Sequence, residues 1–356
     1  MKVNVTIMEK SYHEKIKIEN ELKLRAMTKE LPRFCQEFFL GTEHTTSSRT
    51  RLAYAYDLGI FFSFLHENNP VCRKYEIPSI PISFLDMITP LDIEEYLNYL
   101  KVYTKDGVEH TNDERGISRK LASLRSFYNY FFRKQMITSN PPDLVKTPKL
   151  HEKEIIRLDV DEVAMLLDEV ESGEKLTAHQ LAYHEQTKLR DLALLSLLLG
   201  TGIRVSECVG LDLNDVDFKN NGITVTRKGG NQMVVYFGDE VAGALRQYIE
   251  NDRKASSPLS GHENALFLST QRRRMGVQAV ENMVKKYARQ VTPNKKITPH
   301  KLRSTYGTTL YKETGDIYLV ADVLGHKDVN TTKKHYAAID EDRRRMAASA
   351  VKLRES

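Results

Sequence analysis

The sequence T-P-H-K-L-R-S-T-Y-G-T-T-L-Y at residues 298–311 predicts a helix with a polar pair in its first turn. Pro299 suits the first position of a helix, where the missing N–H group costs nothing. His300 and Arg303 stand three positions apart, so they lie on the same face of that helix. A helix N-terminus also favours anions. The stretch therefore predicts a helix whose first turn can bind an anionic group such as a phosphate.

A second segment, L-G-H-K-D-V-N-T-T-K-K-H-Y-A at residues 324–337, follows a polar turn. Residues 316–324 are apolar at helical spacing, and Gly325 is typical of the residue that ends a helix. His326 is then held at the end of this helix. Tyr336 comes ten residues later, beyond a short helix expected from about Thr331.

Together, His300, Arg303, His326 and Tyr336 could surround one phosphate. Alone, none of them indicates a site. A His-x-x-Arg pair on a helix is far more often solvated, and a single tyrosine in a polar turn usually belongs to the surface or the core. The hypothesis therefore depends on further residues upstream.

Composition describes an ordinary soluble chain. A length of 356 residues favours two domains, and 28% of the residues are charged. No apolar run approaches the ~20 residues of a membrane helix, and residues 1–10 lack the apolar region of a signal peptide. The 3 cysteines form no C-x-x-C pair, so neither a disulfide framework nor a zinc site is indicated. We expect a reduced, cytoplasmic protein without a membrane segment.

Net charge is +5, which is compatible with nucleic-acid binding without requiring it. Residues 115–137 contain six basic residues and no acidic one, together with an apolar stripe at helical spacing. A helix with a packed aromatic face and an unbalanced basic face suits a DNA backbone, and Arg119, Lys120 and Arg125 are the candidate DNA contacts. A core helix whose basic face meets only water is an equally open interpretation.

The region before this helix predicts further helices over residues 21–39, 49–68 and 90–103, with a loop over residues 70–90 that contains four prolines. The first domain is thus expected to be all-α. Asn140-Pro141-Pro142 and Lys146-Thr147-Pro148-Lys149 then indicate a linker that helices do not cross.

The second domain is expected to be mixed. Helices are predicted over residues 160–171, 187–199, 240–253 and 277–290. A β-hairpin around Gly229-Gly230 is predicted over residues 222–237. Arg204 follows the two glycines of G-T-G-I-R-V-S-E, and Lys228 stands at the hairpin tip. Neither residue needs a functional explanation, since an arginine can simply follow a helix cap and lysines are common at hairpin tips.

The order T-G-I-R-V-S-E, V-T-R-K-G-G, P-H-K-L-R, L-G-H and H-Y-A resembles the tyrosine recombinases, or phage integrase family. The resemblance is close over residues 158–337 and looser over the basic helix at residues 117–130. The whole chain is most similar to bacterial Xer recombinases, including the single-recombinase kind of some Gram-positive bacteria. Two departures are Ser304, where many relatives carry a second histidine, and residues 1–20, which have no clear counterpart.

The resemblance implies a mainly α fold in four parts. These are an N-terminal core-binding domain of the SAM-like helical-bundle type (residues 1–145), a linker (146–157), a mixed α/β catalytic domain with a small antiparallel sheet (158–340) and a C-terminal helix or tail that contacts a neighbouring subunit (341–356). The partners implied are double-stranded DNA with a specific recombination site, a homotetramer of this chain and a cell-division DNA translocase.

The implied reaction is a transesterification of the type IB topoisomerase kind, in which a tyrosine attacks DNA and forms a 3′-phosphotyrosine. The catalytic set that the family pattern implies is Arg204, Lys228, His300, Arg303, His326 and the nucleophile Tyr336. Glu207, one turn from Arg204, is expected to orient it. Fixed cations can stabilise the phosphate charge, so we expect no metal and no cofactor.

Three alternatives to a Xer-like role in chromosome dimer resolution stay open from the sequence. One is integration or excision of a mobile element, and another is a topoisomerase that reseals DNA without strand exchange. The third is a non-catalytic DNA-binding protein with the same fold, which the complete catalytic set disfavours.

Overall fold

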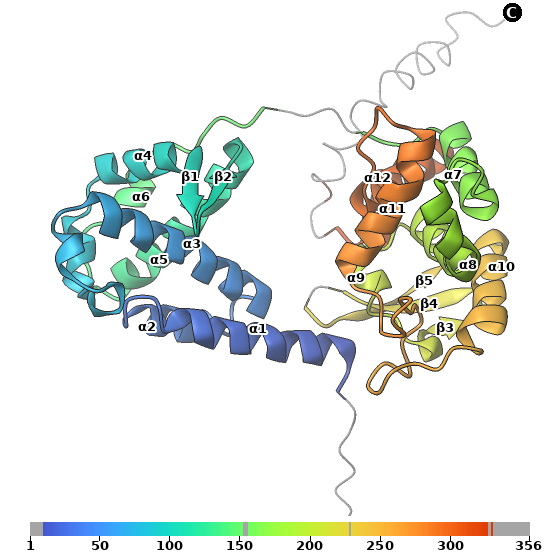
Figure 1. Cartoon of the computed structure of the whole chain (residues 1–356). Helices are drawn as coiled ribbons and strands as arrows, with labels where there is room; N and C mark the ends of the chain where they lie inside the picture. Colours follow the sequence, from blue (N-terminus) through green and yellow to red (C-terminus); the bar gives the residue numbers. More distant parts are fainter. Residues whose placement is uncertain (1–9, 152–155, 228, 327–328, 330–356) are drawn as a thin grey trace, which may run out of the picture. The chain divides into compact units, whose positions relative to one another are not determined.

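The computed structural model describes residues 10–151, 156–227, 229–326 and 329. The chain divides into two compact units, Met1–Lys153 and Glu154–Ser356 (Figure 1). Lys228, Tyr336, the short helix expected from Thr331 and the tail 341–356 lie outside the described residues. The linker limits, 146–157, stay a prediction.

The first unit is helical except for one hairpin. Its elements are α1 (Tyr12–Thr28), α2 (Cys35–Gly41), α3 (Ser48–Asn68), α4 (Pro90–Tyr99), β1 (Val102–Lys105), β2 (Val108–Thr111), α5 (Glu114–Arg133) and α6 (Pro141–Leu144), with three short 3-10 turns at Cys72–Lys74, Ile77–Ser79 and Ile82–Met87. A loop is expected over residues 70–90 because of their prolines, and residues 70–89 contain only these short turns.

Two predictions for this unit were wrong. The helix expected over residues 21–39 is two helices, α1 and α2, because Pro32 between them cannot continue a helix. The helix expected to reach Tyr103 ends at Tyr99, and the antiparallel pair β1–β2 follows. Asp106 and Gly107 form its turn with positive φ angles of 51° and 75°, as an Asp-Gly hairpin requires. The first domain is therefore not all-α.

The core of the first unit is aromatic. Phe34, Phe38 and Phe127 are buried, and Phe127 meets the Phe38 ring edge-on with centroids 5.2 Å apart. Such edge-to-face contacts are favoured over flat sandwiches. The apolar stripe predicted for α5 is buried from Ile117 to Phe131, whereas Phe132 at its end is 44% exposed.

The polar face of α5 is anchored to α3 by a buried carboxylate. Asp57 is 1% exposed and accepts two hydrogen bonds from the Arg119 guanidinium, at 2.5 and 2.7 Å. The Ser123 hydroxyl donates a third, at 2.6 Å. Burying a charge is costly unless it is paired and hydrogen-bonded, so Asp57 depends on these partners.

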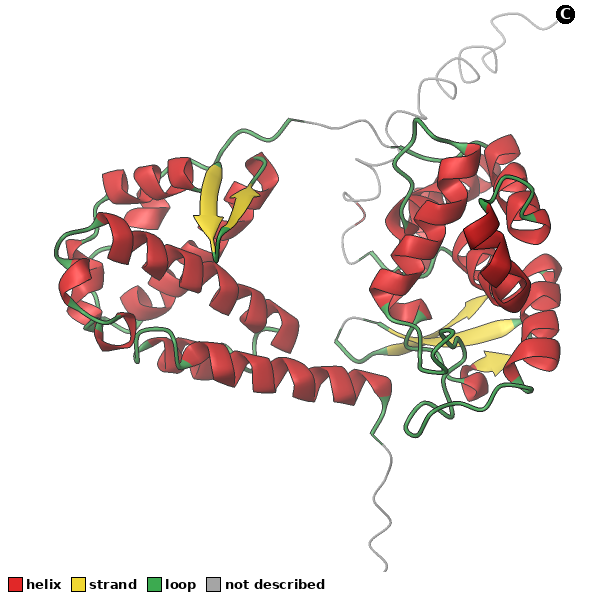
Figure 2. Cartoon of the chain, in the orientation of Figure 1, coloured by secondary structure: helices red, strands yellow, loops and turns green. Residues whose placement is uncertain are grey.

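The second unit packs seven α-helices and one small sheet within the described residues, with a 3-10 turn at Leu213–Asp215 and a π-helix at Tyr248–Arg253 that follows α10 (Figure 2). Its elements are α7 (Val160–Ser172), α8 (Ala178–Thr201), α9 (Val205–Cys208), β3 (Val216–Asp217), β4 (Gly222–Thr226), β5 (Gln232–Tyr236), α10 (Asp239–Gln247), α11 (Val277–Val291), α12 (Pro299–Thr314) and α13 (Ile317–Leu324). The sheet is antiparallel in the order β3-β4-β5. The mainly α fold with a small antiparallel sheet in the second unit is confirmed.

Helix α8 is the centre of this unit and packs against α7, α10 and α12. It begins at Ala178, nine residues before the expected position 187, because Thr177 and Gln180 form a capping box there. Asp191 on α8 is buried and accepts hydrogen bonds from Arg190 at 2.7 Å and from Tyr287 on α11 at 3.0 Å. No helix in the described part of the chain is long and apolar enough to cross a membrane.

Substituting Arg119→Ala is expected to destabilise the first unit, because Asp57 then stays buried with only Ser123 as a donor. Removing one partner of a buried pair costs about 3–5 kcal/mol, and the remaining hydrogen bond places the loss near the lower end of that range. Hydrogen exchange of α3 and α5 peptides measures this unit specifically. Arg115→Ala, on the exposed face of the same helix, is the control. Equal protection in both variants would contradict the prediction.

Candidate active site

Helix α12 begins as the sequence predicts, with Thr298 as its N-cap and Pro299 in its first turn. His300 is exposed in that turn. Arg303, one turn further along, is only 5% exposed. The helix thus presents one exposed and one buried member of the predicted polar pair.

Arg303 connects the ends of two other helices. Its Nη1 donates to the carbonyl of Gly202, which caps α8, at 2.5 Å, and its Nη2 donates to the carbonyl of Leu324, the last residue of α13. Carbonyls at a helix C-terminus lack partners within the helix and bear a partial negative charge. A guanidinium is therefore a stabilising partner for both.

Both cap positions need glycine. Gly202 and Gly325 have φ angles of 61°, in the left-handed region that favours glycine. A Cβ on Gly202 would lie 2.4 Å from the Tyr306 ring. The glycines flanking this site are thus required both by backbone conformation and by close packing.

Arg204 is held by Glu207. The Arg204 Nη1 donates to Oε1 of Glu207 at 2.8 Å, and the Arg204 backbone N–H donates to Oε2 at 2.8 Å. Glu207 is 3% exposed, whereas the Arg204 side chain is 37% exposed. Arg204 Nη2 also approaches the Gly325 carbonyl at 3.4 Å. The buried carboxylate therefore fixes an arginine whose guanidinium still faces solvent.

A third arginine, which sequence reasoning missed, meets the same helix end. The Arg227 Nη2 donates to the carbonyl of Val323 at 2.7 Å. Three consecutive carbonyls, those of Val323, Leu324 and Gly325, thus receive hydrogen bonds from Arg227, Arg303 and Arg204 respectively. The only sequence signal for Arg227 is its place beside Lys228 in T-R-K-G-G.

The charge of Arg227 is not fully compensated. Burial lowers its pKa below the ordinary value, and the Arg204 charge acts in the same direction, whereas the carboxylates of Glu207 and Asp322 oppose this shift. Within the described residues, its Nε and Nη1 are buried and have no hydrogen-bond acceptor. Three guanidiniums beside two carboxylates, Glu207 and Asp322, keep an excess of positive charge, which favours the binding of an anion.

His326 follows this helix end directly. Its backbone N–H donates to the carbonyl of Ala321 at 2.9 Å, closing the turn at Gly325 as predicted, and the residue is half-buried. The structure thus brings His326 together with Arg204 and Arg303 at the C-terminus of α13. His300 lies at the start of the helix that contains Arg303.

The turn that contains Lys228 is described on both sides of that residue. The Arg227 N–H donates to Asn231 at 2.8 Å, and the Gly230 N–H donates back to Arg227 at 3.0 Å. Gly229 and Gly230 have φ angles of 102° and 87°. The predicted β-hairpin around these glycines is confirmed, with strands β4 and β5 paired from Gly222↔Tyr236 to Thr226↔Gln232.

Two tyrosines on α12, Tyr306 and Tyr311, pack in the core and are therefore poor candidates for a nucleophile. Tyr311 is 8% exposed and packs with Val320 and Leu324, and Tyr306 packs against the same cluster. Burial raises the pKa of the Tyr306 phenol, which makes its deprotonation harder.

The candidate DNA contacts of the first unit all have partners within that unit. Lys120 is 6% exposed and donates to Asn112 at 2.6 Å. Arg125 donates to the carbonyls of Pro142 at 3.0 Å and Val145 at 2.6 Å. Arg119 is paired with Asp57, yet 52% of its side chain is exposed. DNA contact by the three stays a prediction, and Arg119 has the most surface available for it.

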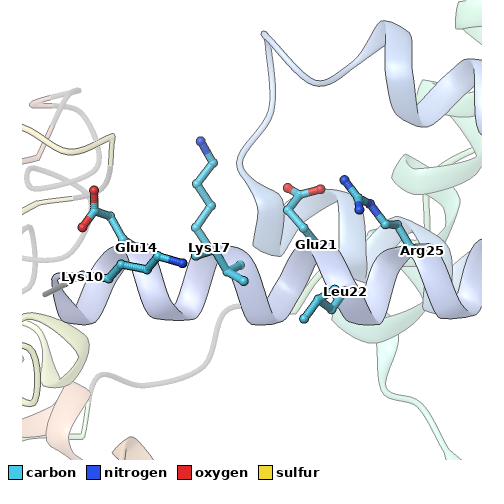
Figure 3. A pocket seen from close by; sticks show the side chains of 7 residues that line it. Lys10, Glu14, Lys17, Glu21, Leu22 and Arg25 are labelled. Carbon is cyan, nitrogen blue, oxygen red and sulfur yellow. The ribbon is translucent and has the colours of Figure 1, made fainter. Parts of the chain in front are cut away.

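A shallow pocket of about 380 Å³ lies along α1, away from all these residues in the sequence (Figure 3). Its lining comes from Lys10 and from α1, where Glu14, Lys17, Glu21 and Arg25 project to one side and Leu22 projects to another. Acidic and basic groups alternate there, so the pocket has no charge preference, and we assign it no role.

Solved structures share this fold. One is a XerH site-specific recombinase in a post-cleavage complex with its difH substrate, with a TM-score of 0.64 and 17% identity over 85% of this chain and 80% of that one. Another is the Tn1549 transposon integrase in complex with transposon right end DNA, with a TM-score of 0.61 and 23% identity over 89% and 99%. At these identities the likeness concerns the fold alone.

Sequence relatives are closer. A tyrosine recombinase XerC of Caldanaerobacter subterraneus is 33% identical over 326 residues, which cover 89% of this chain and 86% of the relative. A tyrosine recombinase XerD of Staphylococcus epidermidis is 30% identical over 295 residues, which cover 83% and 90%. The model of the phage integrase family matches residues 157–343, more than half of the chain. The chain therefore belongs to the phage integrase family, the tyrosine recombinases.

Proposed function

We propose that this protein is a Xer-like site-specific recombinase that cleaves and rejoins double-stranded DNA through a 3′-phosphotyrosine intermediate. The observation that supports it best is the convergence of Arg204 and Arg303 on the C-terminus of α13, immediately before His326. The family match and the XerC and XerD relatives support the same activity. The non-catalytic and topoisomerase alternatives are not favoured.

In this proposal, the Tyr336 oxygen attacks the scissile phosphorus. A bond forms between the tyrosine oxygen and phosphorus, the bond from phosphorus to the 5′-oxygen breaks, and the 5′-oxygen leaves with the electron pair. The phosphotyrosine conserves the energy of the broken bond, so a 5′-hydroxyl can reverse the step without ATP. A phenol with a pKa of ~10 must lose its proton as it attacks, and the leaving oxygen must gain one.

Negative charge gathers on the non-bridging oxygens during this step, and fixed guanidiniums can stabilise it. Arg204 suits direct phosphate contact, because Glu207 fixes one edge of its guanidinium while the side chain remains 37% exposed. Arg303 is more deeply set and holds the two helix ends together while adding its charge. A forked guanidinium can do both, whereas a lysine ammonium cannot.

Proton transfer is assigned to two other residues, and a third contacts the phosphate. Lys228 is the general acid for the leaving 5′-oxygen, and His300, exposed in the first turn of α12, assists proton transfer at the tyrosine. His326 hydrogen-bonds a non-bridging oxygen. None of these roles needs a metal ion, so we expect cleavage in the presence of a chelator.

The biological role proposed is chromosome dimer resolution in the cytoplasm, by a homotetramer that joins two DNA sites and responds to a cell-division DNA translocase. Integration or excision of a mobile element is the second candidate. The XerC and XerD relatives support the first, since they match over most of both chains.

Tyr336→Phe is expected to abolish covalent capture of DNA and leave DNA binding intact, because only the nucleophilic oxygen is lost. The full-length chain is incubated with a suicide duplex containing a candidate site, in EDTA, and the denaturant-resistant adduct is measured. Tyr306→Phe, on the packed face of α12, is the matched control and keeps the adduct. An adduct that persists in Tyr336→Phe would mean that another residue is the nucleophile.

Glu207→Gln is expected to slow adduct formation about 10–100-fold, as loss of an orienting partner commonly does. The amide is similar in size but removes the buried charge that fixes Arg204. Single-turnover cleavage rates and DNA affinity are compared with those of Glu240→Gln, an exposed position on α10. Wild-type cleavage by Glu207→Gln would show that Arg204 does not depend on this carboxylate.

Deleting residues 347–356 is expected to spare DNA binding but to impair recombination, because the tail is proposed to join neighbouring subunits. Complete recombination between two sites is measured beside DNA affinity. If the truncated protein recombines like the wild type, the proposed role of the tail is wrong.

A further inference from the structure

Arg227 joins the last residues of β4 to the end of α13, two segments 96 residues apart in the sequence. Its Nη2 binds the Val323 carbonyl at 2.7 Å, and its backbone N–H and carbonyl both take part in the β4–β5 turn. The side chain therefore connects the end of the hairpin to the helix C-terminus while its main chain is part of the hairpin turn.

The guanidinium lies directly against Gly325. A Cβ built on Gly325 would fall 1.1 Å from Nη1 of Arg227, so the arginine occupies the space that any larger residue would need. In this position Nε and Nη1 are buried without an acceptor among the described residues. Burying donors in this way is unfavourable by itself.

The two segments joined by Arg227 hold proposed catalytic residues. Lys228 is the next residue in the chain, and His326 follows Gly325. Each of them is therefore joined by one peptide bond to a residue that takes part in the contact.

From this arrangement we propose that Arg227 is a positioning residue, which holds the β4–β5 turn against the Gly325–His326 turn so that Lys228 reaches the leaving 5′-oxygen. The proposal rests on the function proposed above, in which Lys228 donates that proton. Arg227 is thus assigned no contact with the DNA. Its side chain acts through the hydrogen bond to the Val323 carbonyl and through its packing against the Cα of Gly325, which carries no side chain.

The test uses a leaving group that needs no proton. In a suicide duplex with sulfur in place of the bridging 5′-oxygen, the Tyr336 oxygen bonds to phosphorus, the phosphorus–sulfur bond breaks and the electron pair leaves on a thiolate. A thiol has a pKa of about 8.5, far below that of an alcohol, so its departure needs no general acid. A variant that has lost only the placement of Lys228 should regain its cleavage rate on this duplex.

Arg227→Ala is expected to cleave the ordinary duplex about 100-fold more slowly, which is the effect of a misplacement of roughly 1 Å in an active site. On the sulfur-containing duplex its rate should return close to that of the wild type. Arg227→Lys keeps the charge but lacks the planar guanidinium that packs against Gly325, so it should behave like Arg227→Ala. Lys219→Ala, which removes one exposed positive charge beside β3, is the control and should match the wild type on both duplexes.

The outcomes distinguish the positioning role proposed for Arg227 from the general-acid role proposed for Lys228. If sulfur rescues Lys228→Ala but not Arg227→Ala, Arg227 does not position the general acid, and this inference is overturned alone. If sulfur rescues neither, the assignment of Lys228 as general acid fails, and this inference fails with it. Full activity of Arg227→Lys on the ordinary duplex would reduce the role of Arg227 to its charge and would also overturn the proposal.

A double-mutant cycle tests the contact independently. Gly325→Ala should reduce cleavage in the wild-type background for two reasons, because it strains a backbone with a φ angle of 61° and because it displaces Arg227. Only the strain should remain in Arg227→Ala, so the same substitution should have a smaller effect there. Multiplicative effects of the two substitutions would show that the contact has no consequence for cleavage. DNA affinity, measured for every variant, verifies that each protein is folded.

Discussion

The second unit depends on the hydrogen bonds that three arginines donate to the C-terminus of α13. Its last carbonyls have no partners within the helix, and Val323, Leu324 and Gly325 each accept a hydrogen bond from a different arginine. Guanidiniums brought this close would repel one another without such acceptors. The helix end supplies them from the backbone, which carries no net charge, so these hydrogen bonds leave the cluster positive for a phosphate.

The elements of the second unit were largely predictable, because each is marked by a local signal. Pro299 starts α12, Gly325 ends α13, and Gly229-Gly230 turns the hairpin. Errors arose where two signals overlapped. Apolar spacing continued past Pro32 and past Tyr99, and it concealed the helix break and the Asp106-Gly107 turn that follow.

The site was predictable only where contacts are local. Glu207 lies three residues from Arg204, so their bond could be expected from helical spacing. Arg227 could not be found in this way, since its partner Val323 is 96 residues distant and is a backbone carbonyl, which any sequence supplies. The partners of Arg125 could not be predicted either, because its guanidinium also binds backbone carbonyls, those of Pro142 and Val145.

The pairing of Arg119 with Asp57 has a consequence for the thermodynamics of DNA binding. A guanidinium that is already held by two hydrogen bonds loses little side-chain entropy when it meets a phosphate. Because the neighbouring carboxylate offsets part of its charge, it also releases fewer counterions than a free arginine would. The Arg119 guanidinium would therefore already be ordered before it contacts a phosphate. The contribution of that contact to DNA affinity would depend only weakly on salt concentration.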